Sequence, residues 1–138
     1  METGGSTETL PLSGTDDVVR ARHRVRRLAT DLGFDLVAQT RIVTATSELA
    51  RNTHLHGGGG ELTITQVGDG RRRGLRLEFT DSGPGIPDIE TALTDGWSSR
   101  GGLGLGLGGT RRLVDEFSIW SEPGEGTRVE IVQWLKRS

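Results

Sequence analysis

The chain has 138 residues, of which 32% are hydrophobic, and its net charge is −2 because 17 basic side chains are set against 19 acidic ones. This length fits one domain with one core, and the nearly balanced charge argues against general affinity for nucleic acid or anionic lipid. No apolar run approaches the ~20 residues that span a bilayer. The chain contains no cysteine, and we expect no secretory signal, because no charged start followed by an apolar region is visible. Disulfides and thiolate metal sites are therefore excluded, and we expect a cytoplasmic protein.

The first part of the chain predicts a tail, a short strand and two helices. Residues 1–8 are polar and are expected to form a flexible tail, and residues 10–12 form a strand that its proline confines to a sheet edge. Apolar residues at helical spacing and a final glycine predict a helix over residues 15–33. Asp35 is expected to cap a second helix, which ends in the glycines at positions 57–60.

The rest of the chain predicts a sheet with short helices between its strands. Alternating apolar and polar side chains predict strands at residues 61–67, 74–81, 117–120 and 128–135. Short helices are expected near residues 88–94 and over residues 110–116. This order predicts an α+β fold: a single domain over residues 1–138, built as a two-layer α/β sandwich whose mixed, mostly antiparallel sheet is covered on one face by helices.

Glu48 and Asn52 lie four residues apart on the second helix, so a carboxylate and a carboxamide share one helix face. Such a pair can simply belong to a solvated face. Asparagine is, however, a poor helix former in mid-helix because its side chain competes for backbone hydrogen bonds. A ligand contact would compensate for it, so Asn52 is a candidate binding residue.

Asp81 ends the second predicted strand and is followed by Gly83, Pro84 and Gly85. The segment is either a plain acidic turn or a place where backbone must approach something closely. An ionised aspartate only accepts hydrogen bonds, so a buried Asp81 would select a donor such as an exocyclic amine.

The stretch "GGLGLGLGG" over residues 101–109 alternates glycines with leucines ahead of a predicted helix. Its unshielded N–H groups suit a phosphate chain. It also contains the spacing G-x-G-x-x-G, but a dinucleotide fold would place that signature directly after a strand and early in the chain. A flexible linker is a further alternative, which the regularly spaced leucines disfavour.

Four segments together resemble a known superfamily. "ELARN", "DSGPGIP", "GGLGLGLG" and "GEGT", in this order, resemble the four boxes of the GHKL nucleotide-binding superfamily, which includes histidine kinases, gyrase and Hsp90. The similarity is closer to the anti-sigma regulatory serine/threonine kinases, and it covers residues 15–135. The resemblance supports the two-layer sandwich and makes ATP and Mg²⁺ the expected cofactors.

The resemblance also implies roles for individual residues. Glu48 would act as catalytic base or polarise the attacking group, and Asn52 would hold Mg²⁺. Asp81 would accept a hydrogen bond from the adenine amino group, supported by the hydroxyl of Thr127. Gly83 and Gly85 would line the base and sugar. The phosphates would be held by a mobile lid that contains Gly102, Leu103, Gly104, Leu105 and Gly106.

As a function, the resemblance implies phosphoryl transfer from ATP to a serine or threonine of a STAS-domain antagonist protein in a partner-switching circuit. It also implies binding and activation of a PP2C-type phosphatase. One alternative is an anti-sigma factor that sequesters a sigma factor. Another is a nucleotide-gated binding module without transfer, which Glu48 disfavours because nucleotide binding alone needs no base.

Some residues depart from the family pattern or fit two readings. Leu105 stands where a small residue is usual, and His54 and His56 stand where aromatic or apolar residues are expected; two histidines without a third ligand make a weak metal site. Arg100 fits either a γ-phosphate contact or a solvated charge. The basic residues from Arg20 to Arg27 fit either a solvated face or a docking surface for an acidic partner.

Overall fold

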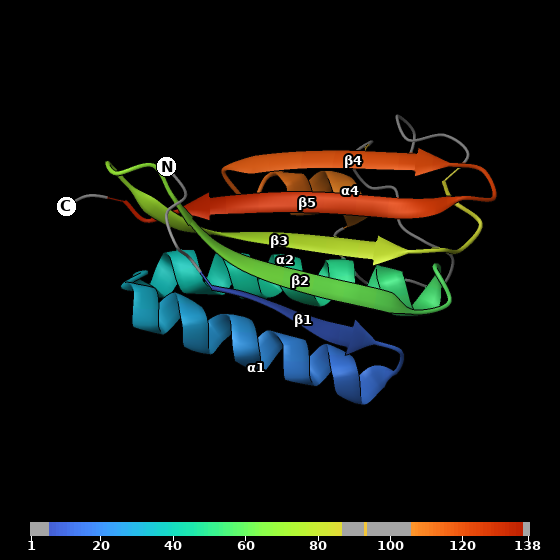
Figure 1. The fold of residues 1–138 in the computed structure, drawn as a ribbon, viewed down its shortest axis with the longest axis horizontal. Coiled ribbons are helices and arrows are strands. Elements are labelled where there is room, and N and C mark those ends of the chain that lie inside the picture. The colour runs from blue at the N-terminus through green and yellow to red at the C-terminus, as the bar shows by residue number, and fades with distance from the viewer. Residues whose placement is uncertain (1–5, 87–92, 94–105, 137–138) are drawn as a thin grey trace.

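The computed structural model describes residues 6–86, 93 and 106–136. Its centre is a five-stranded sheet in the order β1-β2-β3-β5-β4, and all four strand pairings are antiparallel (Figure 1). The strands are β1 (Thr7–Leu12), β2 (Gly60–Gly68), β3 (Arg73–Asp81), β4 (Glu116–Glu122) and β5 (Gly126–Trp134). The α+β sandwich is confirmed. No parallel pairing joins the described strands, so the sheet is simpler than the mixed one expected.

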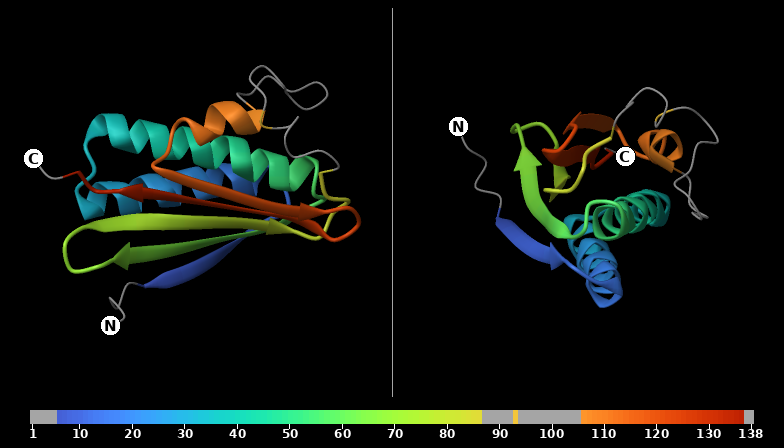
Figure 2. Two further views of the ribbon diagram at one scale, coloured as in Figure 1. Left: turned by 90° about the horizontal axis from the view of Figure 1, so that it is seen from above. Right: turned by 90° about the vertical axis from the view of Figure 1, so that its right-hand side faces the viewer.

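Two long helices, α1 (Thr15–Leu32) and α2 (Leu36–Leu55), and the short α4 (Gly106–Arg111) lie over one face of the sheet (Figure 2). The predicted C-cap of α1 and the predicted N-cap of α2 are both observed. The Asp35 carboxylate accepts from the backbone N–H of Ala38 at 2.8 Å, and Gly33, at φ +106°, ends α1. Among the described residues, no helix is long and apolar enough to cross a membrane.

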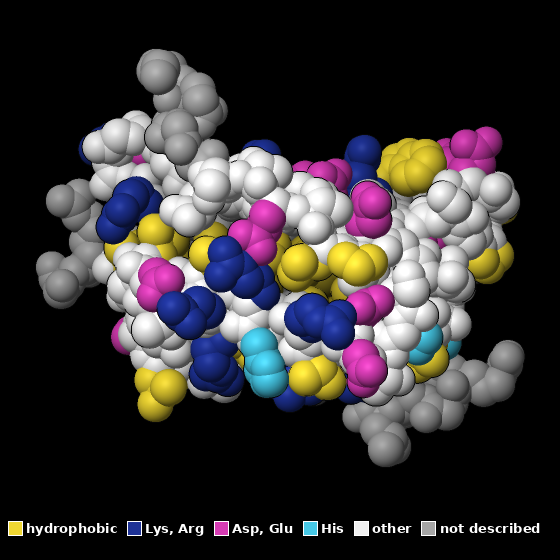
Figure 3. Space-filling view, turned by 60° about the horizontal axis from the view of Figure 1, so that its bottom comes forward, with side chains coloured by type: hydrophobic (Ala, Val, Ile, Leu, Met, Phe, Trp, Pro, Cys, Tyr) yellow, Lys and Arg dark blue, Asp and Glu magenta, His cyan; other side chains and the backbone are white. Residues whose placement is uncertain are grey.

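The outer face of α1 carries acidic side chains among its arginines (Figure 3). Arg20 pairs with Asp17 at 2.6 Å, and Arg27 lies 3.6 Å from a carboxylate oxygen of Asp31. Arg24 makes two hydrogen bonds to Glu8 of β1, at 2.7 and 2.8 Å. Three of the arginines are thus neutralised within the chain, and the docking surface for an acidic partner stays a prediction.

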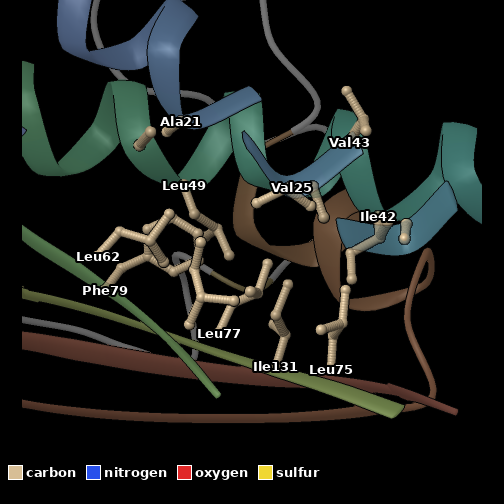
Figure 4. Packing of buried hydrophobic residues seen from close by; sticks show 14 of the residues in the cluster. Ala21, Val25, Ile42, Val43, Leu49, Leu62, Leu75, Leu77, Phe79 and Ile131 are labelled. Atoms are coloured by element: carbon tan, nitrogen blue, oxygen red, sulfur yellow. The ribbon is translucent and has the colours of Figure 1, made fainter. Parts of the chain in front are cut away.

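The hydrophobic core lies between the helices and the sheet (Figure 4). Its fully buried side chains include Ala21 and Val25 of α1, Ile42 of α2, Leu62 of β2, Leu77 of β3 and Ile131 of β5. Leu49 and Phe79, which are 2% and 1% exposed, join α2 to β3 near the ends of both elements. This contact brings the C-terminal half of α2 next to the end of β3.

The structure corrects the expected tail. Strand β1 begins at Thr7, so Thr7 and Glu8 do not belong to a flexible tail; residues 1–5 lie outside the described part of the chain. Thr7 pairs with Thr65 of β2, and Glu8 is held by Arg24. Both contacts join residues far apart in sequence. The prediction that residues 10–12 form an edge strand is confirmed, because β1 pairs only with β2 among the described strands.

The helix expected over residues 110–116 is also wrong in its bounds. Helix α4 ends at Arg111, and β4 already begins at Glu116. The reason is a long-range contact: the Asp115 carboxylate accepts from the N–H of Trp134 at 2.8 Å, and the Asp115 N–H donates to the side chain of Gln133 at 3.0 Å. These bonds tie Asp115 to β5 and end the helix. The helix expected near residues 88–94 lies almost wholly outside the described residues.

Replacing Glu8 with glutamine should destabilise the fold in a pH-dependent way. The hydrogen bond from Arg24 lowers the pKa of the Glu8 carboxyl. Its stabilising effect is therefore present above the unfolded pKa, about 4.3, and is lost as the pH falls through the folded value. Because the pair is partly exposed, we expect Glu8→Gln to lower the free energy of unfolding at pH 7 by about 0.5–1 kcal/mol.

Urea denaturation of wild type and Glu8→Gln at pH 7 and pH 3 checks this expectation. Glu125→Gln, at an exposed turn residue, is the matched control. Equal stability of wild type and Glu8→Gln at pH 7 would show that the pair does not anchor β1.

Candidate functional site

A pocket opens where the C-terminal half of α2 meets the end of β3 and the first residues of α4 and β5. Its empty volume is about 590 Å³, counting the open solvent at its mouth. Among the predicted site residues, it is lined by Asn52, Asp81, Gly85 and Thr127. Its apolar walls are Leu49, Phe79, Ile86, Leu107 and Val129. The fold thus brings together four predicted residues from three separate motifs.

Asp81 is the last residue of β3 and lies opposite Thr127 of β5 in the strand pairing. Its Oδ1 accepts from the backbone N–H of Gly83 at 2.9 Å, which fixes the carboxylate in the turn after the strand. For Oδ2, no hydrogen bond is found among the described residues. An ionised carboxylate only accepts, so this oxygen can take a donor from a ligand.

Two glycines leave space for Asp81, and a third allows the backbone to approach Gly57. A Cβ on Gly57 would overlap the Asp81 carboxyl group, and a Cβ on Gly126, which has φ +99°, would overlap the Asp81 carbonyl oxygen. A Cβ on Gly83 would lie 2.6 Å from the carbonyl oxygen of Gly57. The sequence analysis took Gly57 only as part of a helix end, and its proximity to Asp81 was missed because the two are 24 residues apart.

The turn after Asp81 packs against the loop between β4 and β5. Gly85 has φ +82°, and a Cβ there would overlap the carbonyl oxygen of Glu122. The N–H of Gly124 donates to the carbonyl of Pro84 at 2.8 Å. The predicted Gly83 and Gly85 therefore have a clear structural reason to be glycine, and Gly85 also lines the pocket.

Ser121 of β4 was missed as a site residue. It lies opposite Thr127 in the strand pairing, and the two hydroxyl oxygens are 2.9 Å apart. The N–H of Ile86 donates to the Ser121 hydroxyl at 2.7 Å. The sequence shows a serine six residues before Thr127, but only the strand register shows that the two residues face each other.

Glu48 lies one helical turn before Asn52 and is not among the pocket-lining residues. Its side chain is 13% exposed, and Oε2 lies 3.6 Å from Nη2 of Arg51. Asn52 is half-buried and does line the pocket. The structure thus places the carboxamide at the pocket wall and the carboxylate beside it on the same helix.

Several predicted residues lie elsewhere. Arg100 and the sites Gly102, Leu103, Gly104 and Leu105 lie outside the described residues. Gly106 is the first residue of α4, and the buried Leu107 after it lines the pocket, although the predicted site residues ended at Gly106.

The two histidines at the end of α2 differ in position. His56 caps the helix and lines the pocket, a role that the sequence analysis did not assign. His54 precedes it on the helix and is not among the lining residues. Within the described part of the chain, no group of three or more histidine or acidic side chains could hold a metal ion.

The arrangement suits a flat heteroaromatic ring that carries an amino group. The apolar walls can cover the faces of such a ring, and Asp81 and Thr127 supply polar contacts at its edge. Pockets of this kind are mostly apolar, with a few polar groups that fix the orientation of the ligand. Asn52 of α2, which lines the same pocket, offers an amide oxygen, a ligand type that Mg²⁺ accepts.

Comparison with known proteins agrees with this geometry. The family model described as "Histidine kinase-, DNA gyrase B-, and HSP90-like ATPase" matches residues 37–137. The serine/threonine-protein kinase RsbT of Bacillus subtilis is 51% identical over 87% of this chain and 90% of its own length. An anti-sigma F factor of Clostridium acetobutylicum is 33% identical over 79% of each chain.

A solved structure supports the fold. The crystal structure of the RsbU and RsbW domains of a Mycobacterium tuberculosis protein superposes with a TM-score of 0.67 at 23% identity, covering 99% of this chain and 34% of that one. With the family match over most of the chain and a relative of 51% identity, the chain belongs to the family of histidine kinase-, DNA gyrase B- and HSP90-like ATPases.

Proposed function

We infer that this chain is an ATP-dependent serine/threonine-protein kinase of a partner-switching pathway. The observation that carries the proposal is the meeting of Asn52 on α2 with Asp81 on β3 in one pocket, in a chain 51% identical to a named serine/threonine-protein kinase. Different elements supply the two residues, and together they offer one contact to a base and one to a metal-bound phosphate chain.

The proposed base contact is the hydrogen bond from the adenine amino group to Asp81, with Thr127 beside it. Glycine at position 57 fits this role, because a Cβ there would fill the space beside the Asp81 carboxylate. Guanine would place its carbonyl oxygen against Asp81, and an unpaired buried acceptor costs about 1–3 kcal/mol. The site therefore favours ATP over GTP. We assign Gly85, which lines the pocket, to the base and sugar side; Gly83 is not among the lining residues, and its N–H holds the Asp81 carboxylate.

The proposed Mg²⁺ ligand is the amide oxygen of Asn52. Mg²⁺ usually keeps several waters and takes only one or two protein oxygens beside substrate phosphates. One carboxamide oxygen is therefore enough as the ligand supplied by the protein. We assign phosphate contacts to Gly102, Gly104 and Gly106 with Leu103 and Leu105 between them, on the resemblance of this stretch to the family's glycine-rich box. ATP, when bound, supplies the phosphoryl group.

Glu48 is the proposed base. Glu48 lies one turn before Asn52 on the same helix, and its carboxylate can accept or polarise the proton of a serine or threonine hydroxyl. Arg51, 3.6 Å away, holds the carboxylate by charge. Most of the catalysis would come from positioning and charge neutralisation, as is general for phosphoryl transfer.

The proposed phosphoacceptor is a small STAS-domain antagonist protein, and a PP2C-type phosphatase is a proposed second partner. Both assignments rest on the similarity to RsbT. A second candidate function is sequestration of a sigma factor, which is favoured by relatives named anti-sigma F factors at 27–33% identity. The two functions share the nucleotide site and differ in the partner.

Asp81→Asn should weaken ATP binding about tenfold to hundredfold, because the amide presents N–H groups where the adenine amino group needs an acceptor. Isothermal titration with Mg-ATP measures the change. Asp31→Asn, the same substitution on the exposed face of α1, should leave the affinity unaltered. Unchanged affinity in Asp81→Asn would contradict the assigned base contact.

Glu48→Gln and Asn52→Ala should separate chemistry from metal binding. We expect Glu48→Gln to bind ATP normally but to transfer phosphate about 10²–10⁴-fold more slowly, since it lacks the base. Asn52→Ala should lose the increase in ATP affinity that Mg²⁺ gives to wild type. Transfer from labelled ATP to a purified STAS-domain protein of the same organism, together with titrations with and without Mg²⁺, measures both effects.

One pattern of results would favour the second function. If wild type transfers no phosphate to that STAS protein but binds a sigma factor tightly, the chain is an anti-sigma factor. Equal transfer by wild type and Glu48→Gln would remove Glu48 from the chemistry.

A further inference from the structure

The half-buried hydroxyl of Ser121 lies behind the pocket wall and contacts three groups at once. It accepts a hydrogen bond from the N–H of Ile86 at 2.7 Å and donates one to the carbonyl oxygen of Gly126 at 3.0 Å. Its oxygen also lies 2.9 Å from Oγ1 of Thr127. Ser121 itself does not line the pocket, whereas Thr127 does.

Counting protons fixes the direction of the bond between the two hydroxyls. A serine hydroxyl has one proton and two lone pairs. The Ser121 proton goes to the carbonyl oxygen of Gly126, which can only accept, and one lone pair takes the N–H of Ile86. The Ser121 oxygen therefore has only its second lone pair available for Thr127. The Thr127 hydroxyl must therefore donate its proton to Ser121, and it presents only lone pairs to the pocket.

This direction changes what the pocket can recognise. Asp81 lies opposite Thr127 in the strand pairing, and its carboxylate also only accepts. A ligand group at this edge of the pocket thus meets acceptors from both strands. An amino group can donate one N–H bond to each acceptor. A carbonyl oxygen has no proton to donate, so its lone pairs would be repelled by those of Asp81 and Thr127.

We propose that Ser121 is a positioning residue that sets the direction of the Thr127 hydroxyl and so makes the pocket prefer a 6-amino purine to a 6-oxo purine. The inference rests on the proposed function, because it requires that Asp81 and Thr127 meet the base. It adds a second source of base selectivity beside the carboxylate. Without Ser121, the Thr127 hydroxyl can rotate and donate to a 6-oxo group.

The test compares ATP with inosine triphosphate, which carries a 6-oxo group in place of the amino group, by isothermal titration. We expect wild type to prefer ATP, and Ser121→Ala to reduce the ratio of the two dissociation constants about fivefold to tenfold, the range of one ordinary hydrogen bond. Ser118→Ala, at an exposed serine on the same strand, is the control and should keep the wild-type ratio.

A purely structural role for Ser121 would give a different result. Its removal leaves the N–H of Ile86 and the carbonyl of Gly126 without their partner, which would weaken both nucleotides alike and leave the ratio unchanged. Thr127→Val removes the hydroxyl that Ser121 directs. In that background, Ser121→Ala should no longer alter the ratio, because the two residues act as one unit. Ser121→Cys, a nearly isosteric variant with a weak thiol acceptor, serves if the alanine variant does not fold.

The outcomes separate this inference from the proposed function. An unchanged ratio in both Ser121 variants, or an equal change with and without the Thr127 hydroxyl, would overturn the inference alone, provided that ATP still binds and Asp81→Asn weakens it. If wild type binds neither nucleotide, the proposed function and the inference fail together.

Discussion

The close approach of three chain segments around Asp81 is the constraint on which the site depends. The end of α2, the end of β3 and the start of β5 converge there, so closely that glycines take the place of residues with side chains. Side chains at Gly57 or Gly126 would overlap Asp81 itself. The carboxylate of Asp81 therefore requires a glycine at position 57, and the backbone carbonyl of Asp81 requires a glycine at position 126.

The hydrophobic core supplies the rigidity that this arrangement needs. Leu49 and Phe79 are buried between α2 and β3, and each also forms part of the pocket wall. Asn52 follows Leu49 by nearly one helical turn, and Asp81 follows Phe79 by two residues of strand, on the same face of the sheet. The positions of the carboxamide and the carboxylate are thus set by the core packing between α2 and β3.

Local patterns in the sequence predict local structure well and long-range structure poorly. Helical periodicity with Asp35 as a cap predicts both long helices, because these signals lie within a few residues. The start of β1 at Thr7 and the end of α4 depend on partners about 60 and 20 residues away, respectively, which no local pattern contains. At the site, motifs identify Asn52, Asp81 and Thr127 but not His56, which also lines the pocket. Gly57 and Ser121 become visible only through the folded chain, since proximity and strand register define their roles.

A crystal structure with Mg²⁺ and a non-hydrolysable ATP analogue most directly tests the central claim, which is that Asp81 recognises the amino group of the base. The account predicts the purine between the apolar walls, with its amino nitrogen about 2.7–3.2 Å from Oδ2 of Asp81. A purine bound elsewhere, or bound here with Asp81 turned away from it, would contradict the account.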